Sequence, residues 1–338
     1  MDSFTQVLLG AAVAESVAGK QLGRKASAWG AVLGILPDLD YFVRYANPVD
    51  SFILHRSFSH SLLMFAILTP FLLWVVAKLH PEDQPYRRRW LWLVVLCLAT
   101  HSLLDCMTIY GTQIFWPVSS HPFGLGSVFI IDPVYTLALL IACVTAVVSR
   151  SGAANKVVRA GLLLSTLYLA WGMLAQNIVS RDLERHVSTM DMQVKQVLVT
   201  PAPFNSLLWR FVLRVEGGYH EGFISLLDDS GSPSMRFYPS EDEWIGPLQK
   251  VPDAVRLMRF SKGLYSVHQK SGELVLSDIR MGVAPDYVFT FKVAELTDGK
   301  LIEVLPVRYN NRNFSWSKVD WLIQRIGDAS LPLPVGRF

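Results

Sequence analysis

Six side chains in the first third of the chain are of the types that bind metal ions. They lie at the ends of hydrophobic segments, where imidazoles and carboxylates are costly and persist when they line a cavity or bind something. These two groups are the ligands that suit zinc and similar divalent ions. The sequence therefore predicts a polar, metal-loaded pocket between membrane helices, built from Asp38, Asp40, His55, His60, His101 and Asp105.

The spacing of these residues fits such a pocket. His101 and Asp105 are four residues apart, which places both on one face of a helix. Asp38 and Asp40 are two apart, and Pro37 favours a helix break that turns both carboxylates toward one centre. Six ligands exceed the number for one zinc ion and would suit two metal ions, which activate water in phosphoester hydrolysis. The alternative is one ion with outer carboxylates that orient the histidines.

The expected chemistry assigns roles to individual side chains. Zinc is the expected ion, with manganese as the alternative, and Asp38, His101 and Asp105 are the predicted catalytic residues. One of the aspartates would act as general base toward the activated water. Arg56 lies beside the cluster and can bind a phosphate or carboxylate through two hydrogen bonds. Together with Gln6, at the same depth in the first hydrophobic segment, it is predicted to bind the substrate.

The composition is typical of a membrane protein. Hydrophobic residues make up 51% of the chain and charged residues 17%, whereas soluble domains average about 25% charged residues. The formal net charge of +3 is too small to indicate a nucleic-acid partner. We therefore expect the partners to be membrane lipids and a small-molecule or lipid-linked substrate.

The hydrophobic pattern changes near residue 180. Before it, stretches of near 20 apolar residues predict about six membrane helices, at 4–18, 26–43, 58–79, 90–110, 128–148 and 157–179. After residue 190, strand-like segments predict a mainly antiparallel sheet, at 193–199, 209–215, 219–227, 263–268, 273–278 and 287–293, with a closing helix near 318–326. The predicted fold class is an α-helical integral membrane bundle over 1–180, followed by a small mainly-β extramembrane domain over 190–338.

Basic residues concentrate in alternate loops of the predicted bundle. The positive-inside rule places the richer loops in the cytoplasm, and these carry Lys20, Arg24, Lys25, Lys78, Arg87, Arg88, Arg89, Arg150, Lys156 and Arg159. The loops 44–57 and 111–126 and the carboxyl-terminal domain would then lie outside the cytoplasmic membrane. With this topology all six predicted ligands lie at one depth, near the outer leaflet.

Several motifs together resemble a known family. They are Met-Asp-Ser-Phe-Thr-Gln at 1–6, Gly-Ile-Leu-Pro-Asp-Leu-Asp at 34–40, His-Arg-Ser-Phe-Ser-His-Ser-Leu at 55–62 and His-Ser-Leu-Leu-Asp at 101–105. This set resembles the bacterial membrane-bound metal-dependent hydrolases, an inner-membrane group with LexA-regulated members. The resemblance implies an integral membrane protein with metal ligands at these Asp and His positions. Gln6 stands where many members carry histidine and is a poorer metal ligand.

The leading functional hypothesis is a metal-dependent hydrolase of a lipid-linked or amphiphilic phosphoester, acting at the outer face of the membrane. One alternative is a metal-free lipid phosphatase, because 101–105 resembles the last motif of type-2 phosphatidic acid phosphatases, but the partner Pro-Ser-Gly-His motif is missing. A metalloprotease would need His-Glu-x-x-His, which is also missing. A metal-binding or transport protein without hydrolase activity is the non-enzymatic alternative.

Overall fold

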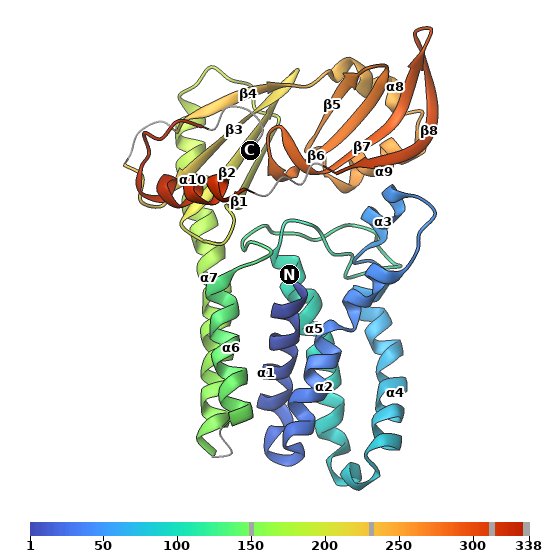
Figure 1. The fold of residues 1–338 in the computed structure, drawn as a ribbon, viewed down its shortest axis with the longest axis vertical. Helices are drawn as coiled ribbons and strands as arrows, with labels where there is room; N and C mark the ends of the chain where they lie inside the picture. The colour runs from blue at the N-terminus through green and yellow to red at the C-terminus, as the bar shows by residue number, and fades with distance from the viewer. Residues whose placement is uncertain (149–151, 230–232, 311–314, 334–338) are drawn as a thin grey trace. The chain divides into compact units, whose positions relative to one another are not determined.

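The computed structural model describes residues 1–148, 152–229, 233–310 and 315–333 (Figure 1). The chain divides into two compact units. The helical unit comprises Met1–Val43, Leu54–Met173 and Pro203–Asn205, and the β unit comprises Arg44–Ile53, Leu174–Ala202 and Ser206–Phe338. A helical amino-terminal half followed by a small, mainly-β domain was predicted from the sequence and is confirmed, and the described strand pairs are all antiparallel.

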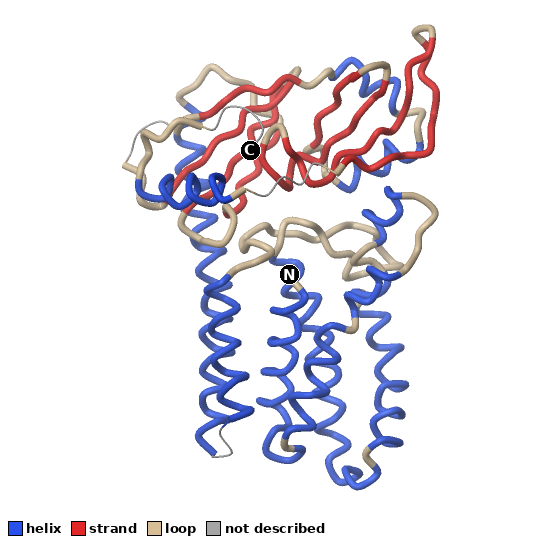
Figure 2. Tube along the Cα trace, in the orientation of Figure 1, coloured by secondary structure: helices blue, strands red, loops and turns tan. Residues whose placement is uncertain are grey.

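Helices dominate the first half of the chain (Figure 2). Pro37 lacks the N–H that continues a helix, and the chain continues from there as a tighter 3₁₀ turn, so the predicted helix 26–43 stops at Ile35. The helices are α1 (Ser3–Leu22), α2 (Arg24–Ile35), α4 (Leu62–Leu79), α5 (Arg87–Met107), α6 (Pro133–Val148) and α7 (Gly152–Ser188), with the 3₁₀ turns η1 (Pro37–Phe42), η2 (Phe58–His60) and η3 (Pro81–Tyr86).

The number of membrane spans differs from the sequence prediction. Among the described residues, three helical stretches are long and apolar enough to cross a membrane: Leu62–Leu79, Pro81–Met107 and Asn155–Ser188. The apolar helix α6 is shorter. The predicted count of six membrane helices is therefore not confirmed, although a helix lies in each of the six predicted segments. Besides α6, the helices α1 and α2 are also not among the candidate spans.

Glycines hold α1 and α2 against each other. A Cβ atom added at Gly30 would lie 2.3 Å from the carbonyl oxygen of Gly10, and one added at Gly34 would lie 2.4 Å from the carbonyl oxygen of Gln6. Any larger residue at these positions would push the two backbones apart. Small residues four apart permit this kind of close helix approach within membranes, and here it fixes Gln6 and Gly34 beside the site described below.

The β unit contains two four-stranded antiparallel sheets. The first has the order β1-β2-β3-β4 and the second the order β5-β6-β7-β8. The strands are β1 (Gln196–Pro201), β2 (Leu208–Val215), β3 (Gly218–Ser225), β4 (Met235–Pro239), β5 (Tyr265–Lys270), β6 (Glu273–Val283), β7 (Asp286–Thr297) and β8 (Lys300–Tyr309). The unit also contains α3 (Pro48–Leu54) up to Ile53, η4 (Asp242–Trp244), α8 (Ile245–Leu248), α9 (Pro252–Phe260) and α10 (Trp316–Gly327).

Turn residues set the register of two hairpins that the sequence predicts. Val215 pairs with Gly218 across the first turn, where Gly217 has a φ of 69°. Lys270 pairs with Glu273 across the second, and the residues between them, Ser271 and Gly272, both have positive φ. In this second turn, positive φ at both central residues meets the requirement of the type I′ turn that suits antiparallel strands.

A buried polar network links β2 and β3 of the first sheet to β7 of the second. Arg210 donates to Glu221 at 2.5 Å, and the hydroxyl of Tyr287 donates to the same carboxylate at 2.9 Å. Burial raises the pKa of the Tyr287 phenol well above its usual value, and the Glu221 carboxylate adds to this rise. The phenol therefore stays protonated and available as a donor.

The short helix α3 connects sequence near the predicted ligands to the β unit. Phe52 packs against the rings of Phe260, Phe289 and Phe291 at centroid distances of 4.3–5.5 Å. Asp50 forms an ion pair of 2.5 Å with Arg256. These contacts explain why 44–53, which the sequence treats as a plain loop, belongs to the β unit.

Candidate metal centre

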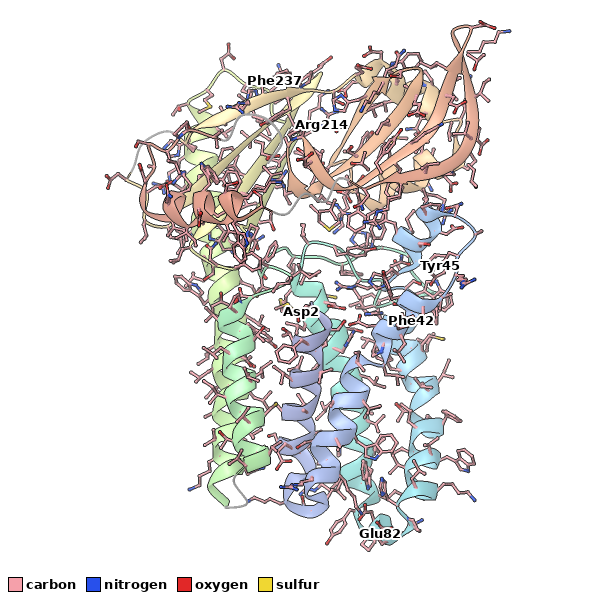
Figure 3. All side chains as sticks on the ribbon, in the orientation of Figure 1. Asp2, Phe42, Tyr45, Glu82, Arg214 and Phe237 are labelled. Atoms are coloured by element: carbon pink, nitrogen blue, oxygen red, sulfur yellow. The ribbon has the colours of Figure 1, made fainter. Side chains whose placement is uncertain are left out.

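The structure brings four of the six predicted ligands together. Asp38 comes from η1, His60 from η2, and His101 and Asp105 from one face of α5. One ligand atom from each of these side chains lies within 4.8 Å of the other three. All four belong to the helical unit, so the cluster is a property of that unit alone. Figure 3 shows Asp2 and Phe42 at one end of these helices and Glu82 at the other.

The separations between the ligand atoms match a four-coordinate metal site. The two histidine Nε2 atoms are 3.1 Å apart. His60 Nε2 lies 3.4 Å from Asp38 Oδ1 and 3.2 Å from Asp105 Oδ2. His101 Nε2 lies 3.6 and 3.5 Å from the same two oxygens. Tetrahedral zinc with bonds of about 2.0–2.1 Å requires ligand atoms about 3.3 Å apart, so the donor set fits this ion.

The hydrogen bonds around the two imidazoles point their Nε2 lone pairs at one another. His101 Nδ1 donates to the carbonyl oxygen of Gly34 at 2.7 Å, which leaves Nε2 without a proton. Ser59 Oγ donates to Asp40 Oδ2 at 2.6 Å and lies 2.9 Å from His60 Nδ1, so it accepts the proton on that nitrogen. With these tautomers both Nε2 atoms are acceptors, and a proton or a metal ion between them would satisfy both.

The carboxylate of Asp105 supplies a third acceptor to the same point. Its Oδ1 accepts from Gln6 Nε2 at 3.1 Å and from the amino group of Met1, and lies 3.3 Å from Arg56 Nη2. Its Oδ2 is buried, and no donor bonds to it among the described residues. A buried carboxylate oxygen without a donor is costly, and here it faces the two Nε2 atoms. A divalent cation at this point would satisfy all of these acceptors.

Asp40 and His55 do not join the cluster. Asp40 Oδ1 lies 2.9 Å from His55 Nδ1, while Oδ2 accepts from the backbone N–H of Arg56 at 3.0 Å and from Ser59. With both oxygens occupied, Asp40 holds the 55–60 loop in place. Its link through Ser59 to His60 is the kind of outer contact that fixes a ligating histidine.

Arg56 is buried behind the cluster rather than open to solvent. Its φ of 62° lies in the left-handed region, which is sparsely populated by residues other than glycine. Its guanidinium lies near Asp105, donates to Thr108 Oγ1 at 3.2 Å and lies over the ring of Tyr110. Backbone strain of this kind persists where the surroundings enforce it, often at functional sites.

Two functional positions were missed by the sequence reasoning. No role in the site was predicted for Ser59, which connects Asp40 with His60, while Ser61 caps the following helix by accepting from Met64 N. Gly34 was not expected to contact a ligand. The Gly-x-x-x-Gly spacing of residues 30 and 34 would have indicated the close approach of α1 and α2, although not the bond to His101.

A second group of potential ligands lies at the opposite end of the helical unit. Its members are His80, Glu82 and Asp83. Lys25 binds both acids, at 2.5 and 3.1 Å, and the indole N–H of Trp29 donates to His80 Nε2 at 2.9 Å. Lysine and tryptophan therefore already partner these side chains, and the group forms a structural network.

Asp38 is the least buried member of the cluster. The Asp38 side chain is 12% exposed, whereas His60 and Asp105 are fully buried. The residues that follow Asp38 in η1 include three exposed apolar side chains, Leu39, Tyr41 and Phe42, the last two about four-fifths exposed. Asp38 therefore marks the side of the cluster nearest the surface, beside these apolar side chains.

Comparison with known proteins identifies the helical half of the chain. The family model described as YdjM inner membrane protein matches residues 1–179. This range contains all eight residues that the sequence analysis assigns to the site. No curated protein and no solved structure matches the chain.

Proposed function

The chain belongs to the YdjM inner membrane protein family, and we propose that it is a metal-dependent hydrolase of the bacterial inner membrane. The substrate class that we propose is a lipid-linked or amphiphilic phosphoester. The observation that carries the proposal is the convergence of two imidazole Nε2 atoms and two carboxylate oxygens, all acceptors, on one buried point. Such a donor set suits zinc, with manganese as the alternative.

One bound ion accounts for the observed contacts better than two. The four convergent ligand atoms complete the coordination of a single zinc ion. Asp40 and His55, which a second ion would need, bind each other and the loop backbone instead. A divalent ion in this site would supply Lewis acidity toward a phosphoryl oxygen and lower the pKa of water.

The residues around the centre have separate roles in this proposal. Asp38, the one partly exposed ligand, lies where substrate and water enter, and it is our choice for the general base. His60 and His101 are held with Nε2 toward the centre by Ser59 and Gly34. The apolar side chains that follow Asp38 would contact the hydrocarbon part of an amphiphilic substrate.

A metal-binding or transport protein without hydrolase activity is the second candidate, and one observation favours it. Catalytic zinc sites keep a coordination position open, usually with three protein ligands, whereas structural sites have four. This centre presents four protein ligand atoms. The hydrolase proposal therefore requires Asp38 to leave one coordination position of the metal to water or substrate. The metal-free phosphatase is disfavoured because its nucleophile, His101, is buried.

We also propose a multi-pass topology with six spans and an extracytoplasmic carboxyl-terminal domain. The bias of Lys and Arg toward alternate loops supports this orientation. Alkaline phosphatase fused after residue 190 should be active, because this reporter folds only outside the cytoplasm. A green fluorescent protein fused at the same position should be dark, because it does not become fluorescent when it is exported unfolded. A fluorescent fusion with inactive phosphatase would contradict the orientation.

Hydrolysis by the purified protein tests the function. The probes are bis(p-nitrophenyl) phosphate, p-nitrophenyl phosphate and a short-chain phosphatidic acid in detergent. We expect turnover of at least one phosphoester, loss of turnover with a chelator and recovery when zinc or manganese is added. Turnover that resists the chelator would contradict the metal role. Stoichiometric metal without turnover of any probe would favour the second candidate.

A further inference from the structure

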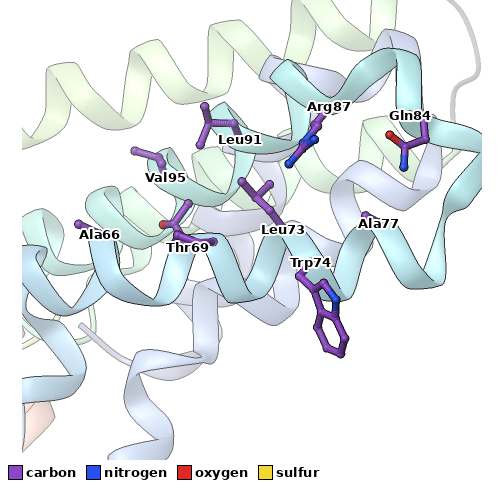
Figure 4. A pocket seen from close by; sticks show the side chains of 10 residues that line it. Ala66, Thr69, Leu73, Trp74, Ala77, Gln84, Arg87, Leu91 and Val95 are labelled. Atoms are coloured by element: carbon purple, nitrogen blue, oxygen red, sulfur yellow. The ribbon is translucent and has the colours of Figure 1, made fainter.

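A groove lies between α4 and α5, away from the metal centre. Figure 4 shows it at close range, with residues from α4 on one side and from α5 and η3 on the other. Its volume is about 540 Å³, which is within the range of small-molecule sites. The lining residues are Ala66, Thr69, Pro70, Leu73, Trp74, Ala77, Gln84, Arg87, Leu91 and Val95.

The groove is apolar along its length and polar at one end. Alanines and Pro70 keep the α4 wall shallow, and Leu91 and Val95 form the α5 wall. Arg87 and Gln84 lie together at one end (Figure 4). The side chain of Arg87 is exposed, and it has no ion pair or hydrogen bond among the residues that the structure describes. A cationic group at the end of an apolar channel matches a ligand with an anionic head and a hydrocarbon tail.

The length of the groove corresponds to the hydrocarbon thickness of one leaflet of a bilayer. From Ala66 to Ala77 the groove follows α4 for about 16 Å at 1.5 Å per residue. Half of a hydrocarbon core of about 30 Å is about 15 Å. Both walls belong to candidate membrane spans, Leu62–Leu79 and Pro81–Met107, and Arg87 lies at the first residue of α5. The arginine is therefore at headgroup level when the rest of the groove is in hydrocarbon.

We propose that this groove binds an anionic phospholipid, with its phosphate on Arg87 and one acyl chain along α4 and α5. The neighbouring exposed Lys78 and Arg88 add positive potential at the same end of the helices. Basic pockets between helices at the cytoplasmic surface are suited to anionic headgroups. The groove takes a resident lipid of the membrane, and this proposal is independent of the chemistry at the metal centre.

Native mass spectrometry of the detergent-purified full chain tests the site, with dioleoyl phosphatidylglycerol as the anionic probe and dioleoyl phosphatidylcholine as the neutral one. We expect phosphatidylglycerol to bind more tightly. Arg87→Gln should weaken its binding about tenfold, because a hydrogen bond to a charged group is lost. Arg88→Gln is the matched control, since it removes the same charge one residue away from the lining, and it should change binding less than twofold.

A second variant tests the apolar part of the groove. Ala77→Phe fills the α4 wall and should reduce binding of phosphatidylglycerol while leaving the thermal unfolding temperature of the lipid-free protein unchanged. The proposal is overturned by any of three results: equal affinities for the two lipids, equal loss in the Arg87 and Arg88 variants, or undiminished binding in a folded Ala77→Phe protein. Equal loss in the two arginine variants would mean diffuse surface electrostatics without a defined site.

Discussion

Replacing His101 with alanine should abolish metal binding and, with it, hydrolysis. The substitution removes one of four convergent ligand atoms and leaves His60 Nε2 and two carboxylate oxygens facing an incomplete site. We expect metal affinity to fall by more than about 100-fold, beyond the 10–100-fold loss that removal of an outer contact produces. Elemental analysis of the purified variant measures the first effect, and phosphoester turnover measures the second.

The matched control for this variant is His121→Ala. His121 lies in the 111–132 segment, is exposed and packs against Phe123. It should keep wild-type metal content and turnover. Retention of one metal ion per chain by a folded His101→Ala protein would contradict the proposal that His101 is a metal ligand. The metal-free phosphatase gives a different pattern, in which His101→Ala loses turnover but a chelator leaves the wild type active.

The part of the metal centre that could be predicted from sequence depends on local geometry. His101 and Asp105 share a helix face because their spacing is one helical turn, and the structure places them together. Pro37 was expected to break the helix before Asp38, and α2 indeed ends at Ile35. Such features follow from the spacing and the backbone restrictions of a few neighbouring residues.

The division between inner ligands and outer contacts could not be predicted. Asp40 and His55 have the same residue types as the true convergent set, and the same predicted depth. What separates them is the conformation of the 55–60 loop, where Arg56 adopts a positive φ and its N–H meets Asp40 Oδ2. A left-handed arginine is enforced by tertiary contacts, and no local pattern indicates it.

The strands and helices of the β unit could also be predicted only in part. Strands joined by clear turn residues, such as β5 and β6, were predicted, whereas β4 and β8 were not. β8 is an edge strand that carries Pro306 and is exposed at most of its positions, so the alternation that reveals strands is weak. Helix α3 was missed because its packing partners, including Phe289, are more than 200 residues away.

Asp40→Asn should weaken metal binding about 10–100-fold without unfolding the protein, the range typical for contacts that orient a metal ligand. The carboxylate accepts from the Arg56 N–H and from Ser59, and its other oxygen lies 2.9 Å from His55 Nδ1. An amide keeps one acceptor oxygen and loses the negative charge, so the Arg56 N–H and the Ser59 hydroxyl are left with an uncharged, weaker acceptor or with none.

We expect Asp40→Asn to weaken metal binding through its effect on Ser59 and His60. Without the Asp40 carboxylate, the direction in which the Ser59 hydroxyl donates is less firmly fixed, and so is its position as the acceptor of the proton on His60 Nδ1. Ser59→Ala removes only this link and should reproduce part of the effect, whereas His55→Ala, on the other oxygen, should affect metal affinity less. Competition with a fluorescent zinc chelator measures all three variants, and Asp229→Asn, an exposed carboxylate of the β unit, is the control. Equal zinc affinity in the wild type and Asp40→Asn would mean that the loop orients His60 without Asp40.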